Sequence, residues 1–509
     1  MGILIMLSGT RPLAMPYQIK PAAIFAESRK YITAVQNISS INSLPETQME
    51  SVLHTAYFKL TDETKTTEGK LYSRQFYTSA LKYCFQANDT DGIFYCMEQI
   101  KLLKLKPLSP GNEKLNPISI ATLQRQLRSH RLQYLNYVET GGDVYVMLVT
   151  PDKVNCRKIV FEGYDIVLKD FLEICADKEL LNKYYKKYAQ LSFLLYKKIV
   201  EPMHIAEGRI LLAQEDPLLP FEALTTDSMG NDFLLYHYSI CYTYSATWHF
   251  RAQPIHSAGN GFLGIAPEYY SPGAAQTRLH GAVESLQKIE DLFSIHNTLT
   301  LNAASKHNFL EAAGNCSVLH IYTHAQQENH RPVLYMHDKP LNMFDIGVLK
   351  SNSLQLVFLA ACSTAVINDY KNSSPYSLAD NFINAGASSV VGTLWLTETQ
   401  PTYFISEAFY RLLEQGLSKD EALQQAKIQF IKKEVKPNQL PYYWAGVILL
   451  GDAEPLNPVG KTNASLYLAA IANLLLFAVG IFWKRSPLIF LQVKFPLCNL
   501  HFFSKVGGI

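Results

Sequence analysis

The sequence predicts an α/β protein: a mostly parallel sheet flanked by helices, preceded by a short helical region and followed by a C-terminal transmembrane helix. Three observations support this prediction. Short apolar, β-branched runs alternate with helical segments from about residue 118 to residue 455. Before that stretch, apolar residues recur at three- and four-residue spacing. After it comes one long run without charge.

The composition indicates a folded chain and excludes several classes of protein. Of the 509 residues, 48% are hydrophobic and 18% are charged, which is typical of globular domains. The 46 basic and 44 acidic residues nearly balance, so we expect no nucleic-acid partner. The eight cysteines form no CxxC pair, which argues against a zinc site and a disulfide framework. We therefore expect neither a metal nor a cofactor.

The N-terminal part is expected to be helical. Residues 1–25 form a ragged start without a signal-peptide pattern. Residues 26–115 carry helical spacing, and the polar cluster at 88–92 divides their last part into two helices. Such a hairpin is typical of a degenerate tetratricopeptide repeat, and a simple helical adaptor fits the same residues equally well. In both cases we expect this region to bind a regulatory protein partner.

Strands and helices alternate in the segment 118–300, which follows a proline-rich linker. A helix followed by an extended segment is expected first, and residues 165–204 read as a long helical stretch. Apolar strand candidates in this segment are GDVYVMLVT, GRILLAQ and GFLGIAP. We therefore treat 118–300 as the N-terminal part of a larger domain that ends near residue 455.

The segment 301–455 gives the clearest strand signals. The candidates are SVLHIYTHA, LQLVFLAACST, SSVVGTLW and WAGVILLGD, and well-punctuated helices lie between them. This alternation favours a mostly parallel sheet. In such sheets, ligands bind outside the carboxyl ends of the strands, so these ends are the place to look for chemistry.

Two of these strands end in residues that suit nucleophilic catalysis. His324 ends the first strand and Cys362 ends the second, with a crossover of 38 residues between them. Neighbouring strands would bring an imidazole to a thiol, which lowers the thiol pKa and later protonates a leaving amine. The backbone amides of Cys362 and Ala325 are candidates for an oxyanion hole. A cysteine that merely fills the core is the alternative, and His320 reads as structural.

Six blocks, in order, resemble the CHAT family of caspase-like peptidases, which are often found with tetratricopeptide repeats and are related to separases. The blocks are LLPFEAL, Thr323-His324, LVFLAACST, SLADNFINAGASSVVGTLW, FY…GLSKDEAL and PYYWAGVILLGD, within residues 118–455. The resemblance implies a caspase-like fold and a catalytic dyad of His324 and Cys362. It further implies a cysteine endopeptidase acting on a protein or peptide substrate.

Three positions depart from the family pattern. Ala360 stands where serine is common, and Thr399 stands where an aspartate is frequent. Ala325 replaces the glycine that often follows the histidine, so an oxyanion donor would be displaced if that backbone needed a glycine conformation. The dyad itself is present. An active peptidase and a catalytically inactive scaffold that binds protein partners are therefore the two competing predictions.

Residues 465–483 are predicted to form a single membrane-spanning helix. The run has no charge and would extend roughly 28 Å as a helix. A buried core helix is the alternative. The basic residues of the short tail 484–509 favour a cytoplasmic tail, whereas no export signal precedes the large domain. We expect a C-terminal anchor with the peptidase domain in the cytoplasm.

Overall fold

The computed structural model describes residues 67–103, 116–215, 217–251, 261–271, 276–328, 331–349, 351, 353–362, 377–434 and 439–456. All of them belong to the compact unit that spans residues 1–460. The predicted ragged start 1–25 lies outside these ranges.

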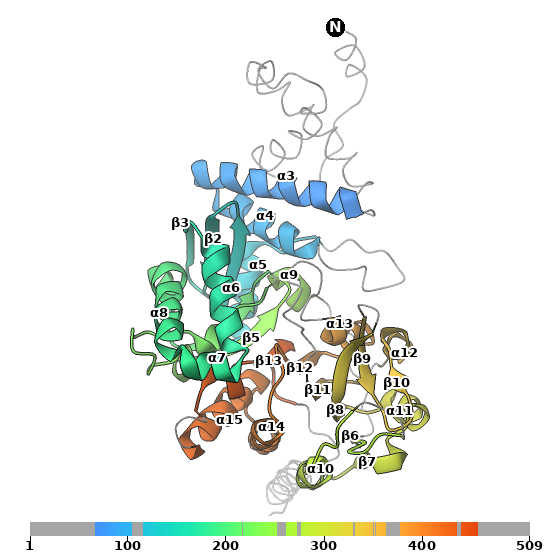
Figure 1. Ribbon diagram of the computed structural model, residues 1–509. Helices are drawn as coiled ribbons and strands as arrows, with labels where there is room; N and C mark the ends of the chain where they lie inside the picture. The colour runs from blue at the N-terminus through green and yellow to red at the C-terminus, as the bar shows by residue number, and fades with distance from the viewer. Residues whose placement is uncertain are drawn as a thin grey trace, which may run out of the picture. The chain divides into compact units, whose positions relative to one another are not determined.

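A helical hairpin comes first among the described elements (Figure 1). It consists of α3 (Thr67–Gln86) and α4 (Thr90–Leu102). The break falls at the predicted polar cluster, where the Asp89 side chain accepts a hydrogen bond from the Gly92 amide. Buried Lys101 of α4 donates to the Tyr137 carbonyl oxygen at 2.5 Å, so the hairpin packs directly on the sheet.

The elements of residues 116–251 form one half of the sheet and its helices. In order they are α5 (Ile120–His130), β1 (Gln133–Thr140), β2 (Asp143–Val149), β3 (Val154–Val160), α6 (Tyr164–Cys175), α7 (Lys178–Lys183), α8 (Tyr185–Leu195), β4 (Gly208–Ala213), β5 (Tyr238–Thr243) and α9 (Ala246–His249). A π-helical turn (Tyr196–Val200) and three 3₁₀ turns (Glu201–Met203, Phe221–Ala223, Leu234–Tyr236) complete this part. The predicted helical stretch 165–204 is thus divided into several short helices.

The elements of residues 261–456 form the other half. They are β6 (Phe262–Ala266), α10 (Ala282–Glu290), β7 (His296–Thr300), α11 (Lys306–Ala313), β8 (Val318–Glu328), β9 (Arg331–Tyr335), β10 (Pro340–Leu341), α12 (Met343–Gly347), β11 (Leu356–Cys362), α13 (Ser377–Asn384), β12 (Ser389–Thr393), α14 (Thr399–Glu414), α15 (Lys419–Lys433) and β13 (Val447–Gly451), with 3₁₀ turns at Leu301–Ala303 and Pro441–Tyr443.

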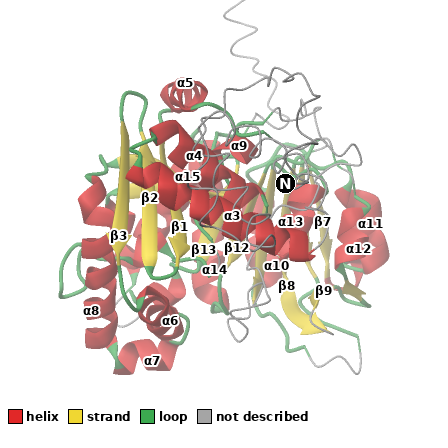
Figure 2. Cartoon of the chain, turned by 90° about the horizontal axis from the view of Figure 1, so that it is seen from above, coloured by secondary structure: helices red, strands yellow, loops and turns green. Residues whose placement is uncertain are grey.

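All the strands belong to one 13-stranded sheet, and helices flank it (Figure 2). The strand order is β10-β9-β8-β11-β12-β13-β5-β4-β1-β2-β3, and β6 pairs with both β8 and β7. Neighbouring strands run parallel in two series, β7–β6–β8–β11–β12 and β1–β4–β5. They run antiparallel between β12 and β13, along β1–β2–β3, and along β8–β9–β10. Because β13 and β5 also pair in parallel, parallel pairs outnumber antiparallel ones, and the sheet is mixed but mostly parallel, as predicted.

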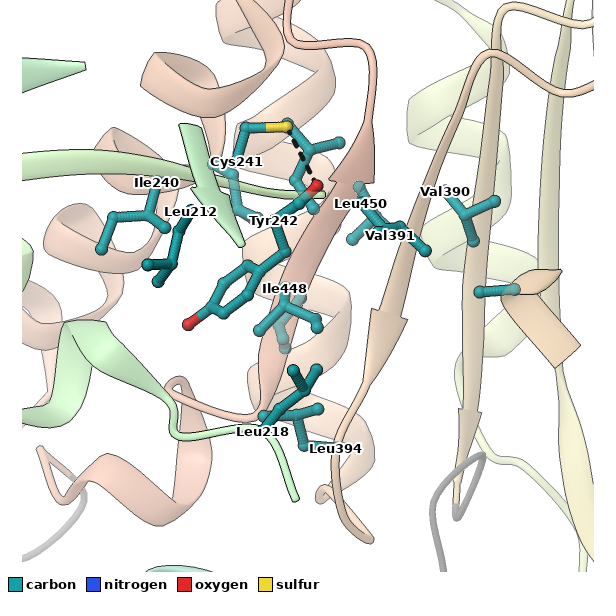
Figure 3. Packing of buried hydrophobic residues seen from close by; sticks show 14 of the residues in the cluster. Leu212, Leu218, Ile240, Cys241, Tyr242, Val390, Val391, Leu394, Ile448 and Leu450 are labelled. Atoms are coloured by element: carbon teal, nitrogen blue, oxygen red, sulfur yellow. Dashed lines mark hydrogen bonds between the residues drawn. The ribbon is translucent and has the colours of Figure 1, made fainter. Parts of the chain in front are cut away.

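The two halves share a core where β5, β13 and β12 lie side by side (Figure 3). Val390 and Val391 of β12 and Leu450 of β13 are at most 1% exposed. Cys241 of β5 is buried, and its thiol donates to the Gly451 carbonyl oxygen at 3.0 Å. Continuous apolar burial of this kind stabilises the sheet across its middle.

The membrane localisation predicted from the sequence is corrected. Within the described ranges, no helix is long and apolar enough to cross a bilayer. The longest of these helices, α3, has 20 residues but carries Glu68, Lys70, Arg74 and Lys82, whereas a bilayer core requires an almost uncharged span. The segment 465–483 and the tail 484–509 lie outside the described residues.

Candidate active site

His324 and Cys362 lie opposite each other on adjacent parallel strands. His324 belongs to β8, Cys362 is the last residue of β11, and the two are Cα partners at the end of the β8–β11 register. Neighbouring strands lie about 4.8 Å apart, so the backbones of His324 and Cys362 are close enough for side chains of this length to meet. The prediction that these strands are neighbours pointing the same way is confirmed.

The imidazole of His324 has a defined hydrogen bond at one nitrogen. Its Nε2 atom lies 2.8 Å from the carbonyl oxygen of Thr277. Because a carbonyl oxygen only accepts hydrogen bonds, Nε2 must carry the proton. In the neutral ring the lone pair is then on Nδ1, for which no partner lies among the described residues. Nδ1 is therefore the nitrogen that can take a proton from another group.

A tyrosine from the loop after β6 supports the same histidine. The Tyr270 hydroxyl accepts a hydrogen bond from the His324 amide at 3.3 Å and lies 3.2 Å from the Thr323 hydroxyl oxygen. The rings of Tyr270 and His324 are 5.4 Å apart between centroids. Loop contacts thus reach both the backbone and the ring of His324.

The replacement of glycine by Ala325 does not strain the chain. Ala325 continues β8, where it pairs with Leu334 of β9, and it is buried. It is not among the residues with a positive φ angle, so its backbone adopts a conformation open to any amino acid. The sequence-based concern that this position needs a glycine conformation is therefore removed.

His320 and four of the other cysteines have no features of a reactive group. His320 is fully buried among aromatic rings, and burial lowers its pKa to about 3, so it stays neutral. Burial raises the pKa of the Cys156 and Cys316 thiols to about 12 and also raises the pKa of the Cys175 and Cys241 thiols well above the usual value. These four thiols remain protonated near neutral pH and are poor nucleophiles.

One small cavity adjoins the ends of β8 and β11, and a larger one lies among the neighbouring helices. The small one is lined by Thr323, Ala360 and Tyr403, among others. The larger one of about 450 Å³ shares Tyr403 and is lined by Lys178, Lys288, Lys433, Glu284, Glu398, Glu407, Glu434 and several aromatic residues. Lys178 pairs with Glu398, and Lys288 with Glu407. The charges largely compensate, so this cavity shows no single-sign preference. Within the described ranges, no group of three or more His, Cys, Asp or Glu side chains could hold a metal.

Residues 190–452 match the family model of the CHAT domain. This chain belongs to the CHAT domain family. The match covers more than half of the sequence and includes β4, β8, β11, β12 and both predicted dyad positions.

Two solved structures are similar to parts of this chain. One is the Arg-specific cysteine proteinase gingipain R, at 13% identity and a TM-score of 0.34, with 58% of this chain and 76% of that chain covered. The other is the Saccharomyces cerevisiae separase in its complex with securin, at 12% identity and a TM-score of 0.48. That match covers 86% of this chain and only 38% of the separase chain. No curated protein matches the chain.

The block Leu218–Leu224, which contributes to the family resemblance, is structural in this CHAT protein. Glu222 is buried, accepts a hydrogen bond from the Tyr242 hydroxyl at 2.6 Å, and pairs with buried Lys427 of α15 at 3.1 Å. This ion pair joins the first half of the sheet to a helix of the second half. The block thus ties the two halves together without contacting His324 in any interaction seen here.

The contacts of Thr277 and Tyr270 were not predicted from the sequence. A backbone carbonyl has no residue signature, and Thr277 lies 47 positions before His324. The only available signal was their place in the loop that follows the carboxyl end of β6, next to the strand that carries His324.

Proposed function

We propose that this CHAT-family protein is a cysteine endopeptidase that cleaves a protein or peptide substrate. Cys362 is the nucleophile, and His324 is the general base and then the general acid. The observation that carries the proposal is the register pair of His324 and Cys362 at the ends of β8 and β11. The orientation of the His324 ring, with Nε2–H held by the Thr277 carbonyl, supports it.

The reaction follows from these roles. Nδ1 of His324 takes the proton of the Cys362 thiol, and the thiolate attacks the carbonyl carbon of the scissile peptide bond. The amides of Cys362 and Ala325 donate hydrogen bonds to the oxyanion of the tetrahedral intermediate. Nδ1–H then protonates the leaving amine, and a thioester remains on Cys362. Water, deprotonated by His324, attacks the thioester and releases the carboxylic acid.

The test is a pair of measurements on the parent protein and Cys362→Ala. Cleavage of a degenerate peptide library, read by mass spectrometry, should be lost in the variant, and a peptidyl chloromethyl ketone should alkylate position 362 only in the parent. Cys316→Ala is the matched control, because its thiol is buried and protonated and should leave cleavage intact. Persistent cleavage by Cys362→Ala would refute the nucleophile. No cleavage and no labelling by the parent would favour the inactive scaffold.

We further propose that the N-terminal region, through a protein partner, regulates this activity. The packing of α4 on the sheet limits how this can be tested, because removal of α4 would take away Glu98, the carboxylate that accepts hydrogen bonds from buried Tyr134 and Thr247. A chain that starts at residue 67 retains the hairpin and lacks only residues 1–66. We expect higher basal cleavage from it than from the full chain. Equal cleavage by both forms would contradict regulation by residues 1–66.

A further inference from the structure

The loop between β6 and α10 contacts His324 from two sides. Its first arm, just after β6, carries Tyr270, which meets the His324 amide. Its second arm, just before α10, carries Thr277, whose carbonyl oxygen meets Nε2 of His324. The orientation of the imidazole therefore depends on how these two arms are held together.

One ion pair joins the two arms. The guanidinium of Arg278 directs Nε and Nη2 to Oε1 of Glu268, at 2.9 and 2.6 Å. A backbone bond lies beside it, since the Leu279 amide donates to the Glu268 carbonyl oxygen at 3.1 Å. Arg278 is next to Thr277 in the chain, and Glu268 is two residues from Tyr270. The pair thus lies at the base of both arms that touch His324.

The local structure of Glu268 makes it dependent on this partner. Its side chain is only 4% exposed, whereas that of Arg278 is 42% exposed. Its φ angle is 54°, in the left-handed region that a non-glycine residue adopts at a cost. A buried carboxylate needs a compensating cation, and Arg278 supplies it. Without the guanidinium, both the charge and the strained backbone of Glu268 would favour rearrangement of the first arm.

We propose that Glu268 and Arg278 are positioning residues that fasten this loop, so that the Thr277 carbonyl holds the Nε2–H tautomer of His324. The inference rests on the proposed function in one respect, because the tautomer matters for catalysis only if His324 is the general base. The effect on the tautomer itself is a property of the resting protein and can be measured without any substrate.

The first measurement is the tautomer of His324. The full chain is labelled with ¹⁵N-histidine, and the His324 signals are assigned by comparison with His324→Gln. In the neutral ring of the parent we expect a protonated Nε2 and an unprotonated Nδ1. In Arg278→Gln we expect the signals to shift toward a mixture of the two tautomers. Arg278→Lys retains a cation and should shift them less. Arg128→Gln is the control, because that exposed arginine pairs with Asp152 on the other half of the sheet.

The second measurement is the rate of peptide cleavage. For Arg278→Gln we expect kcat to fall about 10- to 100-fold with KM changed less than about 2-fold, since a misplaced catalytic group affects the chemical step more than binding. Arg278→Lys should recover part of kcat, and Arg128→Gln should resemble the parent. Circular dichroism and thermal melting verify that each variant is folded. If Arg278→Gln does not fold, the tautomer and kcat of Arg278→Lys are compared with those of the parent to test the positioning role.

The outcomes separate the two proposals. A changed tautomer in Arg278→Gln, together with a parent that cleaves nothing, would support the positioning role and refute the peptidase. An active parent whose tautomer and kcat are both unaffected by Arg278→Gln would refute the positioning role and leave the peptidase intact. A fall in kcat with an unchanged tautomer would also refute it, because the effect would then not pass through His324.

Discussion

The hairpin and the first half of the sheet hold fully bonded carboxylates, whereas the second half carries an imidazole with one open nitrogen at a strand end. In the half built by residues 116–251, the carboxylate of Glu222 is fully engaged. It accepts a hydrogen bond from Tyr242 and forms an ion pair with Lys427. Glu98 of the hairpin, which packs on this half, accepts hydrogen bonds from the Tyr134 hydroxyl and from the amide and hydroxyl of Thr247, at 2.6 to 2.7 Å. In the half built by residues 261–456, His324 is bonded at Nε2, and its Nδ1 has no partner among the described residues.

This difference separates the ionisable side chains that stabilise the fold from the one that can take part in a reaction. A buried carboxylate with several donors contributes to structure because its charge is already compensated, and it has no capacity left for a substrate. A half-buried imidazole held at one nitrogen is oriented yet still able to exchange a proton at the other. Substitutions in the first half should therefore change stability, whereas substitution of His324 should change chemistry.

The largest expected effect tests the reactive half. His324→Ala should lower kcat/KM by about 10³-fold or more, because it removes the base and the acid of one reaction path. The double variant with Cys362→Ala should be scarcely worse than either single variant, since residues that act as a unit are not additive. The melting temperature should change little, because His324 is only half-buried. Cleavage kinetics measure kcat/KM, and calorimetry measures the melting temperature. Additive losses in the double variant would contradict a shared path.

A second prediction tests the structural half. Glu222→Gln should lower the free energy of unfolding by about 3–5 kcal/mol, because it leaves Lys427 without its counter-charge in a fully buried site. Burial already lowers the pKa of Lys427, so the lone amine should lose its proton in the variant. Urea unfolding measures the stability, and cleavage per folded molecule should stay near that of the parent.

The control for this variant replaces both partners. Glu222→Leu with Lys427→Met removes the charges while keeping apolar volume, and it should recover much of the lost stability. If Glu222→Gln instead abolished cleavage while leaving stability unchanged, Glu222 would belong to the reactive machinery, and the contrast between the two halves would fail.

Much of the fold was predictable because buried strands have continuous apolar runs. The strands β6, β8, β11, β12 and β13 all fall where such runs predicted them. β3 (Val154–Val160) was missed because it contains Asn155, Arg157 and Lys158, and none of its residues is fully buried. β7 was missed for a related reason, because it is short and mostly polar. β9 was missed because its apolar run, Val333–Tyr335, is only three residues long and follows a proline.

For the candidate site, the sequence predicted only which residues lie at the ends of neighbouring strands. The pairing of His324 with Cys362 followed from two apolar runs and one crossover length, and the register confirms their adjacency. The catalytic roles of these residues stay predictions. The loop contacts could not be predicted, because the Thr277 carbonyl and the Glu268–Arg278 pair depend on the path of the loop in three dimensions rather than on a motif.

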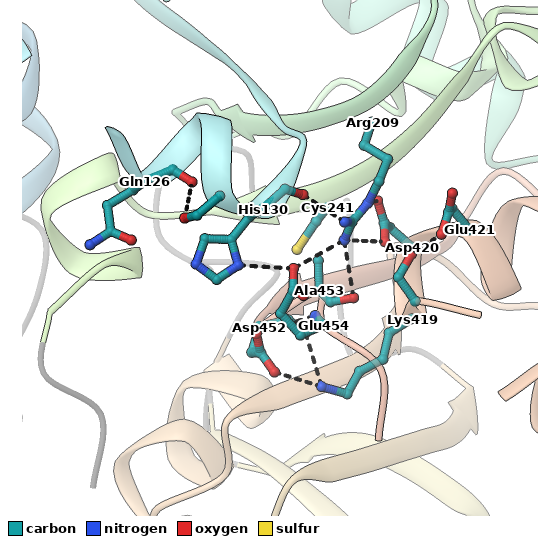
Figure 4. Close-up of polar contacts among 12 residues, drawn as sticks. Gln126, His130, Arg209, Cys241, Lys419, Asp420, Glu421, Asp452, Ala453 and Glu454 are labelled. Carbon is teal, nitrogen blue, oxygen red and sulfur yellow. Dashed lines mark hydrogen bonds and ion pairs between the residues drawn. The ribbon is translucent and has the colours of Figure 1, made fainter. Parts of the chain in front are cut away.

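The smallest expected effect concerns an ion pair that joins the two halves and is partly open to solvent. Nδ1 of His130, at the end of α5, lies 3.2 Å from Oε1 of Glu454, which follows β13 (Figure 4). The hydrogen bond that Glu454 accepts from the His130 ring raises the pKa of His130 above its usual 6.5, and Asp452 adds to this while Arg209 opposes it. The same hydrogen bond lowers the pKa of Glu454 below its usual 4.5.

The signs define a pH window for this pair. A raised histidine pKa contributes stability that is complete below pH 6.5 and is lost as the pH rises through the folded-state pKa. A lowered carboxyl pKa contributes stability that is present above pH 4.5 and is lost as the pH falls through its folded-state pKa. Both contributions are complete only between these limits. Because each side chain is about a third exposed, solvent screening keeps the total near 0.5–1 kcal/mol.

His130→Gln tests this window. The parent should exceed the variant in unfolding free energy at pH 5.5, and the difference should shrink toward pH 8.5 as His130 loses its proton in the parent. Urea unfolding at the two pH values measures it. His307→Gln is the control, since its pair with Glu311 is far more exposed and should give almost no difference at either pH. A difference for His130→Gln that is equal at both pH values would show that the ring acts by packing against Phe250 rather than by its charge.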